Sequence, residues 1–360
     1  MTGSAYAAAG VDVEAGERAV DLMRAAVERA TRPEVVGGFG GFAGLFDAST
    51  LARYRHPLLA TSTDGVGTKV AIAAAMDIHH TIGRDLVAMV VDDLVVVGAE
   101  PLFLTDYIAC GKVHPERIAA VVTGIARGCE LAGCALLGGE TAEHPGLLGP
   151  DDYDVAGAGT AVVEADAVLG PERVRAGDVV IAIASSGLHS NGYSLARKVL
   201  LTDSGWTLDR QVPELGRTLG EELLEPTRIY ARDLLRLRDD LGTDLHALSH
   251  ITGGGLAANL ARVLPEDLAA DIRRGSWEPP AVFQLIGDVG AVSRTDLEAT
   301  FNMGIGMVAV TDNSASDAAL RLLTAAGLDA WVCGEVRARE PGEAGDATAK
   351  GGSGGAVSVG

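Results

Sequence analysis

The order of apolar and polar positions predicts helices and strands that alternate along most of the chain. Helical spacing is found at 12–30, 68–76, 82–97, 115–133, 192–202, 256–263 and 314–326. Apolar runs of strand length lie at 57–63, 101–110, 134–140, 153–166, 178–187, 245–252, 301–311 and 330–336. Because the two kinds of element alternate in both halves, we expect an α/β (α+β) protein with two mixed α/β domains.

The segment "GPERVRAGD" at 170–178 separates the two predicted domains, because a new strand follows it at once. We therefore expect domains at 1–170 and 171–340. Residues 341–360, "PGEAGDATAKGGSGGAVSVG", lack core residues and are expected to form a disordered tail. No apolar run reaches the ~18 residues of a membrane span, and the N-terminus lacks the basic start of a signal peptide. A soluble cytoplasmic protein is therefore expected.

Two adjacent aspartates interrupt the most apolar predicted helix, "DLVAMVVDDLVVVGAEP" at 85–101. A helix turns about 100° per residue, so Asp92 shares a polar strip with Asp85, where we expect it to be solvated. Asp93 instead falls on the apolar stripe that contains Val90. An ionised carboxylate on an apolar face is costly unless it is paired, hydrogen-bonded or bound to a metal. Asp93 is therefore the candidate ligand of the two.

Composition and charge restrict the class of ligand. The 360 residues carry a net charge of −20, with 48% hydrophobic and 22% charged residues. So acidic a chain is unsuited to nucleic acid and to anionic membranes, which attract a positive surface. A phosphorylated small molecule remains compatible, provided that its site supplies cations and N–H donors. The four cysteines show no zinc spacing and are expected to be buried free thiols.

Carboxylates accompany three predicted strands of the first half. Asp64 follows one strand in "STDGVGTK", Asp106 lies within "FLTDYIAC", and Glu140 ends a third in "LLGGETAE". Ligands of α/β domains gather at the carboxyl ends of strands, and convergent carboxylates suit Mg²⁺ that is shared with phosphates. Together with Asp93, these residues favour a metal site. The alternative is that each carboxylate is a turn or capping residue.

Two glycine-containing loops of the second half lead directly into helices: "SSGLHSNGYSLAR" from 185 and "SHITGGGLAANL" from 249. A helix N-terminus offers free N–H groups to an anion, and Ser190 is expected to cap the first helix. His189 and His250 lie in these loops and have either a catalytic or binding role or a structural one. The alternative for both loops is ordinary capping and tight turning.

No P-loop is present, because "CGKV" at 110–113 lacks the hydroxyl residue after lysine and the upstream glycine. Lys69, at the end of "DGVGTK", either meets a phosphate or is a solvated residue of a first helical turn. Taken together, these features favour a metal-dependent enzyme that handles phosphate groups without a P-loop. They do not name its substrate.

The ordered series of motifs is more specific than any one of them. It comprises "YAAAGVDVEAG", "RPEVVGGFGGF", "TDGVGTK", "TIGRDLVAM", "DDLVVVGAEPLFLTDYIACGK", "GGETAEHPG", "YDVAGAG", "SSGLHSNGYSLAR", "EPTRIY", "HITGGG" and "FNMGIGM". Over about residues 6–336 this series closely resembles the phosphoribosylformylglycinamidine cyclo-ligase (aminoimidazole ribonucleotide synthetase) family. The resemblance implies ATP-dependent ring closure of formylglycinamidine ribonucleotide in purine biosynthesis. It also implies a homodimer whose N-terminal domains form a barrel-like core, with Mg²⁺ that is often helped by K⁺.

The resemblance also implies roles for individual residues. The implied metal ligands are Asp64, Asp93 and Glu140. Contacts with ATP would come from Asp64, Gly65, Gly67, Thr68 and Lys69, under a mobile cover that contains Gly38, Gly40 and Gly41. The ribose phosphate or a nucleotide phosphate would be held by Ser190, Asn191, Gly192, Thr252, Gly253, Gly254 and Gly255. The catalytic candidates are Lys69, His189 and His250, and either histidine would move a proton during cyclisation.

Two alternatives stay open at this point. One is another ATP-dependent phosphotransferase of the same superfamily, such as a thiamine-monophosphate kinase. Kinases of that kind lack the pair "SSGLHSNGYS" and "HITGGG" as written here. The other is a non-catalytic nucleotide-binding regulator, which predicts loss of the acidic residues at the motif positions.

Overall fold

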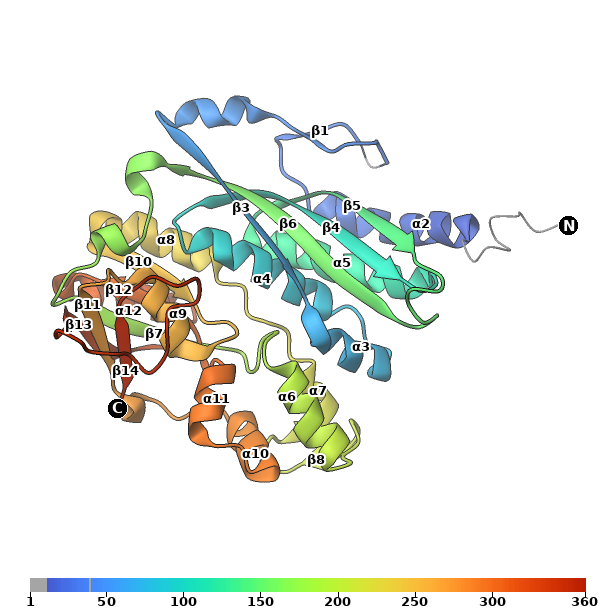
Figure 1. Cartoon of the computed structure of the whole chain (residues 1–360). Helices are drawn as coiled ribbons and strands as arrows, with labels where there is room; N and C mark the ends of the chain where they lie inside the picture. Colours follow the sequence, from blue (N-terminus) through green and yellow to red (C-terminus); the bar gives the residue numbers. More distant parts are fainter. Residues whose placement is uncertain (1–11, 39) are drawn as a thin grey trace, which may run out of the picture. The chain divides into compact units, whose positions relative to one another are not determined.

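The computed structural model describes residues 12–38 and 40–360 of the chain (Figure 1). These form two compact units. The N-terminal unit extends to Leu94 and from Glu100 to Ala165. The C-terminal unit comprises Val95–Ala99 and Asp166–Gly360. Both units combine helices with a β-sheet, so the predicted mixed α/β class is confirmed.

The N-terminal unit is built around a four-stranded sheet with the strand order β3-β6-β4-β5. β6 pairs antiparallel with β3 and β4, while β4 and β5 are parallel. The strands are β3 (Pro57–Gly65), β4 (Glu100–Cys110), β5 (Ala135–Glu143) and β6 (Tyr153–Glu164), and a small hairpin consists of β1 (Val35–Val36) and β2 (Leu45–Phe46). The helices are α2 (Val13–Arg29), α3 (Val70–Met76), α4 (Ile82–Val95) and α5 (Pro115–Ala132).

The two faces of this sheet differ in burial. Side chains on one face of β4, such as Leu104 and Ile108, are fully buried, and α4 lies over this face because Leu86 approaches Gly157 of β6. On the other face, Leu59 is 65% exposed and Tyr107 is 43% exposed. In a single chain, the sheet is therefore covered on one face and exposed on the other. The expected barrel-like core is not formed by one chain.

Helices α4 and α5 approach each other closely at two glycines. A Cβ on Gly83 would lie 2.3 Å from the Val121 carbonyl oxygen, and a Cβ on Gly124 would lie 2.2 Å from the His80 carbonyl oxygen. Any side chain at either position would therefore push the backbones apart. This crossing sets the position of α4, which carries Asp85, Asp92 and Asp93.

The C-terminal unit contains a six-stranded sheet with the strand order β10-β12-β7-β13-β11-β14. All its pairings are antiparallel except that of β11 with β14. Its strands are β7 (Val179–Ala184), β10 (Leu245–His250), β11 (Leu268–Ile272), β12 (Ile305–Thr311), β13 (Ala330–Ala338) and β14 (Ala356–Val359). A separate small hairpin consists of β8 (Gln211–Val212) and β9 (Arg217–Thr218).

The helices of this unit are α6 (Tyr193–Arg197), α7 (Leu219–Leu223), α8 (Ala231–Leu241), α9 (Gly255–Leu260), α10 (Ala281–Gly290), α11 (Arg294–Thr300) and α12 (Ser316–Ala325). Short 3₁₀ turns of the chain lie at Ala48–Arg53, Gly67–Lys69, Ala165–Ala167, Pro171–Arg173, Gly242–Asp244, Ala261–Val263, Arg274–Ser276 and Asn313–Ala315, and Lys198–Asp203 is a π-helical turn. The four cysteines are free and buried, as expected. None of the helices in the described part of the chain has the length and apolar character that a membrane span requires.

The expectation of a disordered tail is wrong for the end of the chain. β14 pairs in parallel with β11, with Ala356 opposite Ala269 and Val359 opposite Ile272. Val357 is fully buried in the same core as residues of α9. The low apolar content of residues 341–360 concealed this strand, because four residues with two valines suffice to complete a sheet edge when their neighbours are glycines.

Candidate functional site

Lys69 and Asp85 form a buried ion pair in the N-terminal unit. The Lys69 Nζ atom lies 2.9 Å from the Asp85 Oδ1 atom, and both side chains are 0% exposed. The sequence left open whether Lys69 meets a phosphate or is solvated, and the solvated alternative is wrong. Lys69 is the last residue of a 3₁₀ turn, Gly67–Lys69, that follows β3 and directs its side chain inward.

The expected placement of the two adjacent aspartates is also wrong. Asp92 is fully buried, whereas Asp93 is partly exposed. The prediction that Asp85 and Asp92 share one strip of α4 agrees with their common burial. That strip is buried because Lys69 from another element supplies a counter-charge at Asp85. Periodicity within the helix cannot reveal a partner from elsewhere in the chain.

Sheet register places two of the carboxylates in one row. Asp64 of β3 and Asp106 of β4 both pair with Gly157 of β6, and Asp106 also pairs with Gly139 of β5. Members of such a row point to the same face, here the face covered by α4. Glu140, one residue beyond Gly139, therefore points to the open face, beside Tyr107.

The three expected metal ligands are not brought together within one chain. Asp64 and Glu140 lie on opposite edge strands and opposite faces, and a spacing of about 4.8 Å per strand separates their backbones by about 14 Å. The carboxylate of Asp64 accepts a hydrogen bond from the Gly65 N–H at 2.7 Å, and that of Glu140 accepts one from the Thr141 N–H at 3.0 Å. Among the residues that the structure describes, no cluster of three His, Cys, Asp or Glu side chains is arranged to hold a metal ion.

Asp106 is the buried acid of this row. Burial raises the pKa of its carboxyl to about 7, because the charged form loses its hydration. Its carboxyl occupies the space beside Gly139, where a Cβ would lie 2.2 Å from Asp106 Oδ1. Gly139 is therefore required for packing, which the motif "LLGGETAE" did not reveal.

The glycine-rich loop of the first half is the exposed tip of the β1–β2 hairpin. Space around Gly38 and Gly40 is open, and Gly40 has a φ of 97°. Gly44 anchors the loop, because a Cβ there would lie 2.4 Å from the Leu137 carbonyl oxygen. Phe39 and residues 1–11, which include part of the first motif, lie outside the described residues. Of the residues expected near ATP, Gly41, Gly67 and Thr68 are exposed, whereas Lys69 is buried.

The loop at 185–192 follows β7 in the C-terminal unit. His189 is 2% exposed and has a φ of 61°, which is uncommon for a residue with a side chain. Its Nε2 atom accepts a hydrogen bond from the Ser186 N–H at 3.1 Å. The proton of a neutral ring is therefore on Nδ1. A Cβ on Gly306 would lie 2.7 Å from His189 Cε1 and 2.0 Å from Tyr230 Oη, so this glycine makes room for both rings.

Neither predicted loop uses a side chain to cap its helix. Gly192 is the N-cap of α6, and the Ser190 Oγ atom lies 3.4 Å from Thr227 Oγ1, so the expected capping by Ser190 is wrong. Gly192 has a φ of 77°, and a Cβ there would lie 2.1 Å from the Phe301 ring. This glycine is therefore required by packing and by backbone conformation.

The three glycines at 253–255 are not all required for the same reason. Gly254 has a φ of 100° and Gly255 a φ of 72°, a region that favours glycine. A Cβ on Gly255 would lie 1.7 Å from the Glu298 carbonyl oxygen, so Gly255 is required by packing against α11. Gly253 has neither constraint, and a Cβ there would lie 3.3 Å from Asn191 Oδ1.

The two loops meet at one end of the C-terminal sheet. Ala184, the last residue of β7, pairs with Ile305, and His250, the last residue of β10, pairs with Met307 on the same strand. The close approach of Asn191 to Gly253 then joins the loops. This arrangement places the loop that contains Ser190, Asn191 and Gly192 beside the loop Thr252–Gly255.

Two buried asparagines that the sequence did not single out hold these loops. Asn302 Nδ2 donates to the Gly187 carbonyl oxygen at 2.9 Å, and its Oδ1 accepts from the Gly304 N–H at 2.8 Å. Asn259 Nδ2 donates to the Gly255 carbonyl oxygen at 2.8 Å. A buried polar residue inside an apolar helix, as in "GLAANLARVLP", is the signal that points to Asn259.

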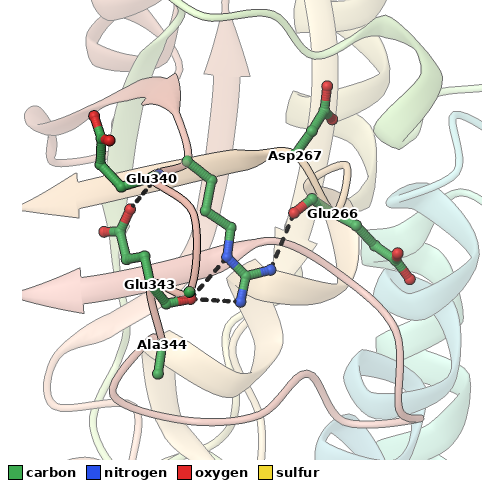
Figure 2. A pocket seen from close by; sticks show the side chains of 7 residues that line it. Glu266, Asp267, Glu340, Glu343 and Ala344 are labelled. Atoms are coloured by element: carbon green, nitrogen blue, oxygen red, sulfur yellow. Dashed lines mark hydrogen bonds between the residues drawn. The ribbon is translucent and has the colours of Figure 1, made fainter.

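A separate surface hollow of about 480 Å³ lies in the C-terminal unit, away from the residues predicted for the site (Figure 2). It is acidic and is lined by Glu266, Asp267, Arg339, Glu340, Gly342, Glu343 and Ala344. Arg339 donates to the carbonyl oxygens of Glu343 at 2.7 Å and Glu266 at 3.0 Å. These contacts attach the start of the segment that leads to β14.

Comparison with known proteins gives two family matches, which together span most of the chain. Residues 47–163 match the N-terminal domain of the AIR synthase related proteins, and residues 175–346 match their C-terminal domain. A phosphoribosylformylglycinamidine cyclo-ligase from Shouchella clausii is 52% identical over 338 residues, covering 94% of this chain and 97% of the relative. The enzyme of the same name from Desulfitobacterium hafniense is 50% identical over 340 residues, covering 94% and 98%.

Solved structures with the same fold are more distant in sequence. A thiamine-monophosphate kinase from Stenotrophomonas maltophilia has a TM-score of 0.65 at 21% identity, covering 94% of this chain and 95% of the other. The hydrogenase maturation protein HypE in complex with ATP has a TM-score of 0.62 at 16% identity, covering 90% and 86%. These likenesses show the fold alone.

Proposed function

Because this chain belongs to the phosphoribosylformylglycinamidine cyclo-ligase family, we propose that it closes the imidazole ring of a purine precursor. The proposed reaction converts formylglycinamidine ribonucleotide and ATP to aminoimidazole ribonucleotide, ADP and phosphate. The observation that carries the proposal is the meeting of the loops 185–192 and 252–255 at one end of the C-terminal sheet. Backbone that is held in tight turns there suits a phosphate group.

The proposed chemistry has two steps. The formyl oxygen of the substrate attacks the γ-phosphorus of ATP, and ADP leaves. The amidine nitrogen then attacks the activated carbon, the ring closes, and the oxygen leaves with its phosphate. Phosphoryl transfer requires positioning and charge neutralisation rather than a covalent nucleophile, which is consistent with a site built from glycine loops and carboxylates.

We assign the nucleotide to the N-terminal unit. Gly65, Gly67 and Thr68 would contact the triphosphate, and the exposed tip that contains Gly38, Gly40 and Gly41 would cover it. Lys69 is proposed to act through its buried pair with Asp85, which fixes the turn that carries Gly67 and Thr68. Mg²⁺ is proposed to enter as part of the MgATP substrate, with K⁺ as an accessory ion. The separation of Asp64 from Glu140 gives no support to a resident metal site within one chain.

In the C-terminal unit, the two loops are proposed to hold a phosphate of the ribonucleotide or of ATP. His189 and His250 are the candidates for proton transfer during ring closure. The hydrogen bond from Ser186 N–H occupies His189 Nε2, so a role of His189 as a base requires a change in that contact. His250, at the end of β10, is 5% exposed.

We further propose that two copies of the chain associate through the open face of the N-terminal sheet. Leu59 and Tyr107 expose apolar surface there, and a second copy would bring its own Glu140, which points to the same face, into this region. Leu59→Glu should then yield a monomer in light scattering at micromolar concentration. Leu22→Glu, on the exposed side of α2, is the matched control. A wild-type monomer would refute the dimer.

The acidic chain is proposed to act in the cytoplasm, without nucleic acid or membrane partners.

The test of the activity is a coupled assay of purified protein with ATP, Mg²⁺ and formylglycinamidine ribonucleotide. We expect one ADP for each aminoimidazole ribonucleotide, which mass spectrometry of the product identifies. Asp64→Asn should lower turnover, whereas Asp317→Asn, an exposed aspartate of α12, should not. Release of ADP only with thiamine monophosphate as acceptor would identify a kinase of the superfamily. Nucleotide binding without any ADP release would identify a regulator.

A further inference from the structure

Asn259 of α9 donates hydrogen bonds to three backbone carbonyls of the glycine loop. Its Nδ2 atom donates to the carbonyl oxygens of Gly255 at 2.8 Å, Thr252 at 3.2 Å and Gly253 at 3.4 Å. Its Oδ1 atom lies 3.4 Å from the Thr252 hydroxyl, which donates to it. The side chain is 1% exposed. Only the NH₂ end of the amide can face three carbonyls, so this network fixes the orientation of the amide.

The orientation of the carbonyls determines that of the N–H groups. In a trans peptide the C=O of one residue and the N–H of the next point in opposite directions. Since the Thr252 and Gly253 carbonyls point toward Asn259, the N–H groups of Gly253 and Gly254 point away from it. These two N–H groups are therefore held on the outer side of the loop.

Ordering the loop in this conformation has an entropic cost. Gly254 and Gly255 both have positive φ values, and glycine loses more conformational freedom on ordering than any other residue. A loop that must be ordered by its ligand binds that ligand less tightly. A buried donor that fixes the carbonyls in the free protein removes this ordering cost.

We propose that Asn259 is a positioning residue, which holds the N–H groups of Gly253 and Gly254 ready for a phosphate group of the substrate or of ATP. The inference rests on the proposed function, since it explains how the loop 252–255 would bind the phosphate group. Asn259 does not touch the ligand, because it lies behind the loop. Its effect is on binding and not on the chemical step.

Two variants test this role. Asn259→Asp keeps the shape of the side chain but replaces the donor with a carboxylate, which faces three carbonyl oxygens. Asn259→Ala removes the side chain. The control is Asn313→Asp, which makes the same chemical change at an exposed asparagine of the same unit. Steady-state kinetics are measured against ATP and against formylglycinamidine ribonucleotide, with the fraction of folded protein measured in parallel by thermal melting.

We expect the KM of one of the two substrates to rise about tenfold or more in both Asn259 variants, and kcat to change by less than about threefold. The control should match the wild type. A merely structural role predicts the opposite pattern, because loss of folded enzyme lowers the apparent kcat and leaves each KM unchanged. That pattern, or unchanged kinetics, would overturn the proposal.

A second measurement does not depend on turnover. Hydrogen–deuterium exchange of the peptide around residues 251–257 is followed with and without inorganic phosphate. Phosphate should slow exchange in the wild type and should slow it much less in Asn259→Asp. Equal protection in both proteins, or none in the wild type, would overturn the role of Asn259. If the wild type lacks cyclisation activity but phosphate protects its loop, the proposed function fails while the positioning role stands.

Discussion

Lys69 and Asp85 form an ion pair whose side chains are both fully buried, with 2.9 Å between Lys69 Nζ and Asp85 Oδ1. Replacing one partner leaves the other charge buried without this counter-charge, which costs about 3–5 kcal/mol. We therefore expect Lys69→Met to lower the free energy of unfolding by that amount in chemical denaturation. The double variant Lys69→Met/Asp85→Leu should regain most of it. If the double variant is no more stable than the single one, the pair is not the source of the effect.

The double variant also separates stability from activity. Lys69 adjoins Gly67 and Thr68, which are proposed to contact the triphosphate. We expect the folded double variant to show a KM for ATP raised by about tenfold or more. Wild-type affinity for ATP in that variant would remove Lys69 from the proposed nucleotide site.

The adjacent aspartates of α4 should respond differently to the same change. Asp92 is fully buried, so Asp92→Asn alters a group that is enclosed by protein and should cost about 1–3 kcal/mol of stability. Asp93 is partly exposed, so Asp93→Asn should leave the melting temperature within a few degrees of the wild type. Its effect is expected on Mg²⁺-dependent turnover. Thermal melts and turnover assays of both variants test whether Asp92 affects mainly stability and Asp93 mainly turnover. A larger loss of stability in Asp93→Asn than in Asp92→Asn would contradict this division.

The pH dependence of stability should contain a contribution from Asp106. Burial raises the pKa of its carboxyl from 3.8 to about 7 in the folded chain, so the folded state binds the proton more tightly than the unfolded state. Its contribution is complete below pH 3.8 and is lost as the pH rises through 7. Three pKa units correspond to about 4 kcal/mol at most. Asp106→Asn should therefore be more stable than the wild type at pH 8, with the difference disappearing near pH 4. A constant difference between pH 4 and pH 8 would contradict this origin.

The three glycines before α9 should differ when each is replaced by alanine. Gly255→Ala places a Cβ 1.7 Å from the Glu298 carbonyl oxygen and should unfold the region or lower the melting temperature sharply. Gly254→Ala imposes a φ of 100° on a residue with a side chain, at a cost of about 1–3 kcal/mol. Gly253→Ala meets only the Asn191 side chain, so it should change ligand affinity with little change in stability. Equal melting temperatures for the three variants would refute this division.

The elements of the fold were predictable where apolar spacing is strong. The helices at 82–97 and 115–133 and the strands at 101–110 and 245–252 correspond to α4, α5, β4 and β10. The register across strands was not predictable, and it is what separates Asp64 from Glu140. Asp106 lies within its strand as expected, whereas Asp64 and Glu140 lie inside β3 and β5 and not at the predicted strand ends. Sequence spacing also carries no information on which face or edge of the sheet each carboxylate occupies.

The site in the C-terminal unit was predictable from its loops but not from its supports. The glycines and histidines of "SSGLHSNGYS" and "HITGGG" lie together at one end of the sheet. Asn302 and Gly306 hold or accommodate the first loop through contacts with residues far away in the sequence. Asn259 holds the second loop through nearby residues, but only the folded loop shows which atoms it contacts. The same limit explains the buried pair of Lys69 and Asp85, whose partners lie on different elements.

The strand β14 lies beyond residue 346, where the family match ends. A shortened protein ended at that residue would leave the outer edge of β11 without its parallel neighbour. Unpaired N–H and C=O groups along an apolar edge recruit strands from other molecules. Ending this chain at residue 346 is therefore expected to promote aggregation through the exposed edge of β11.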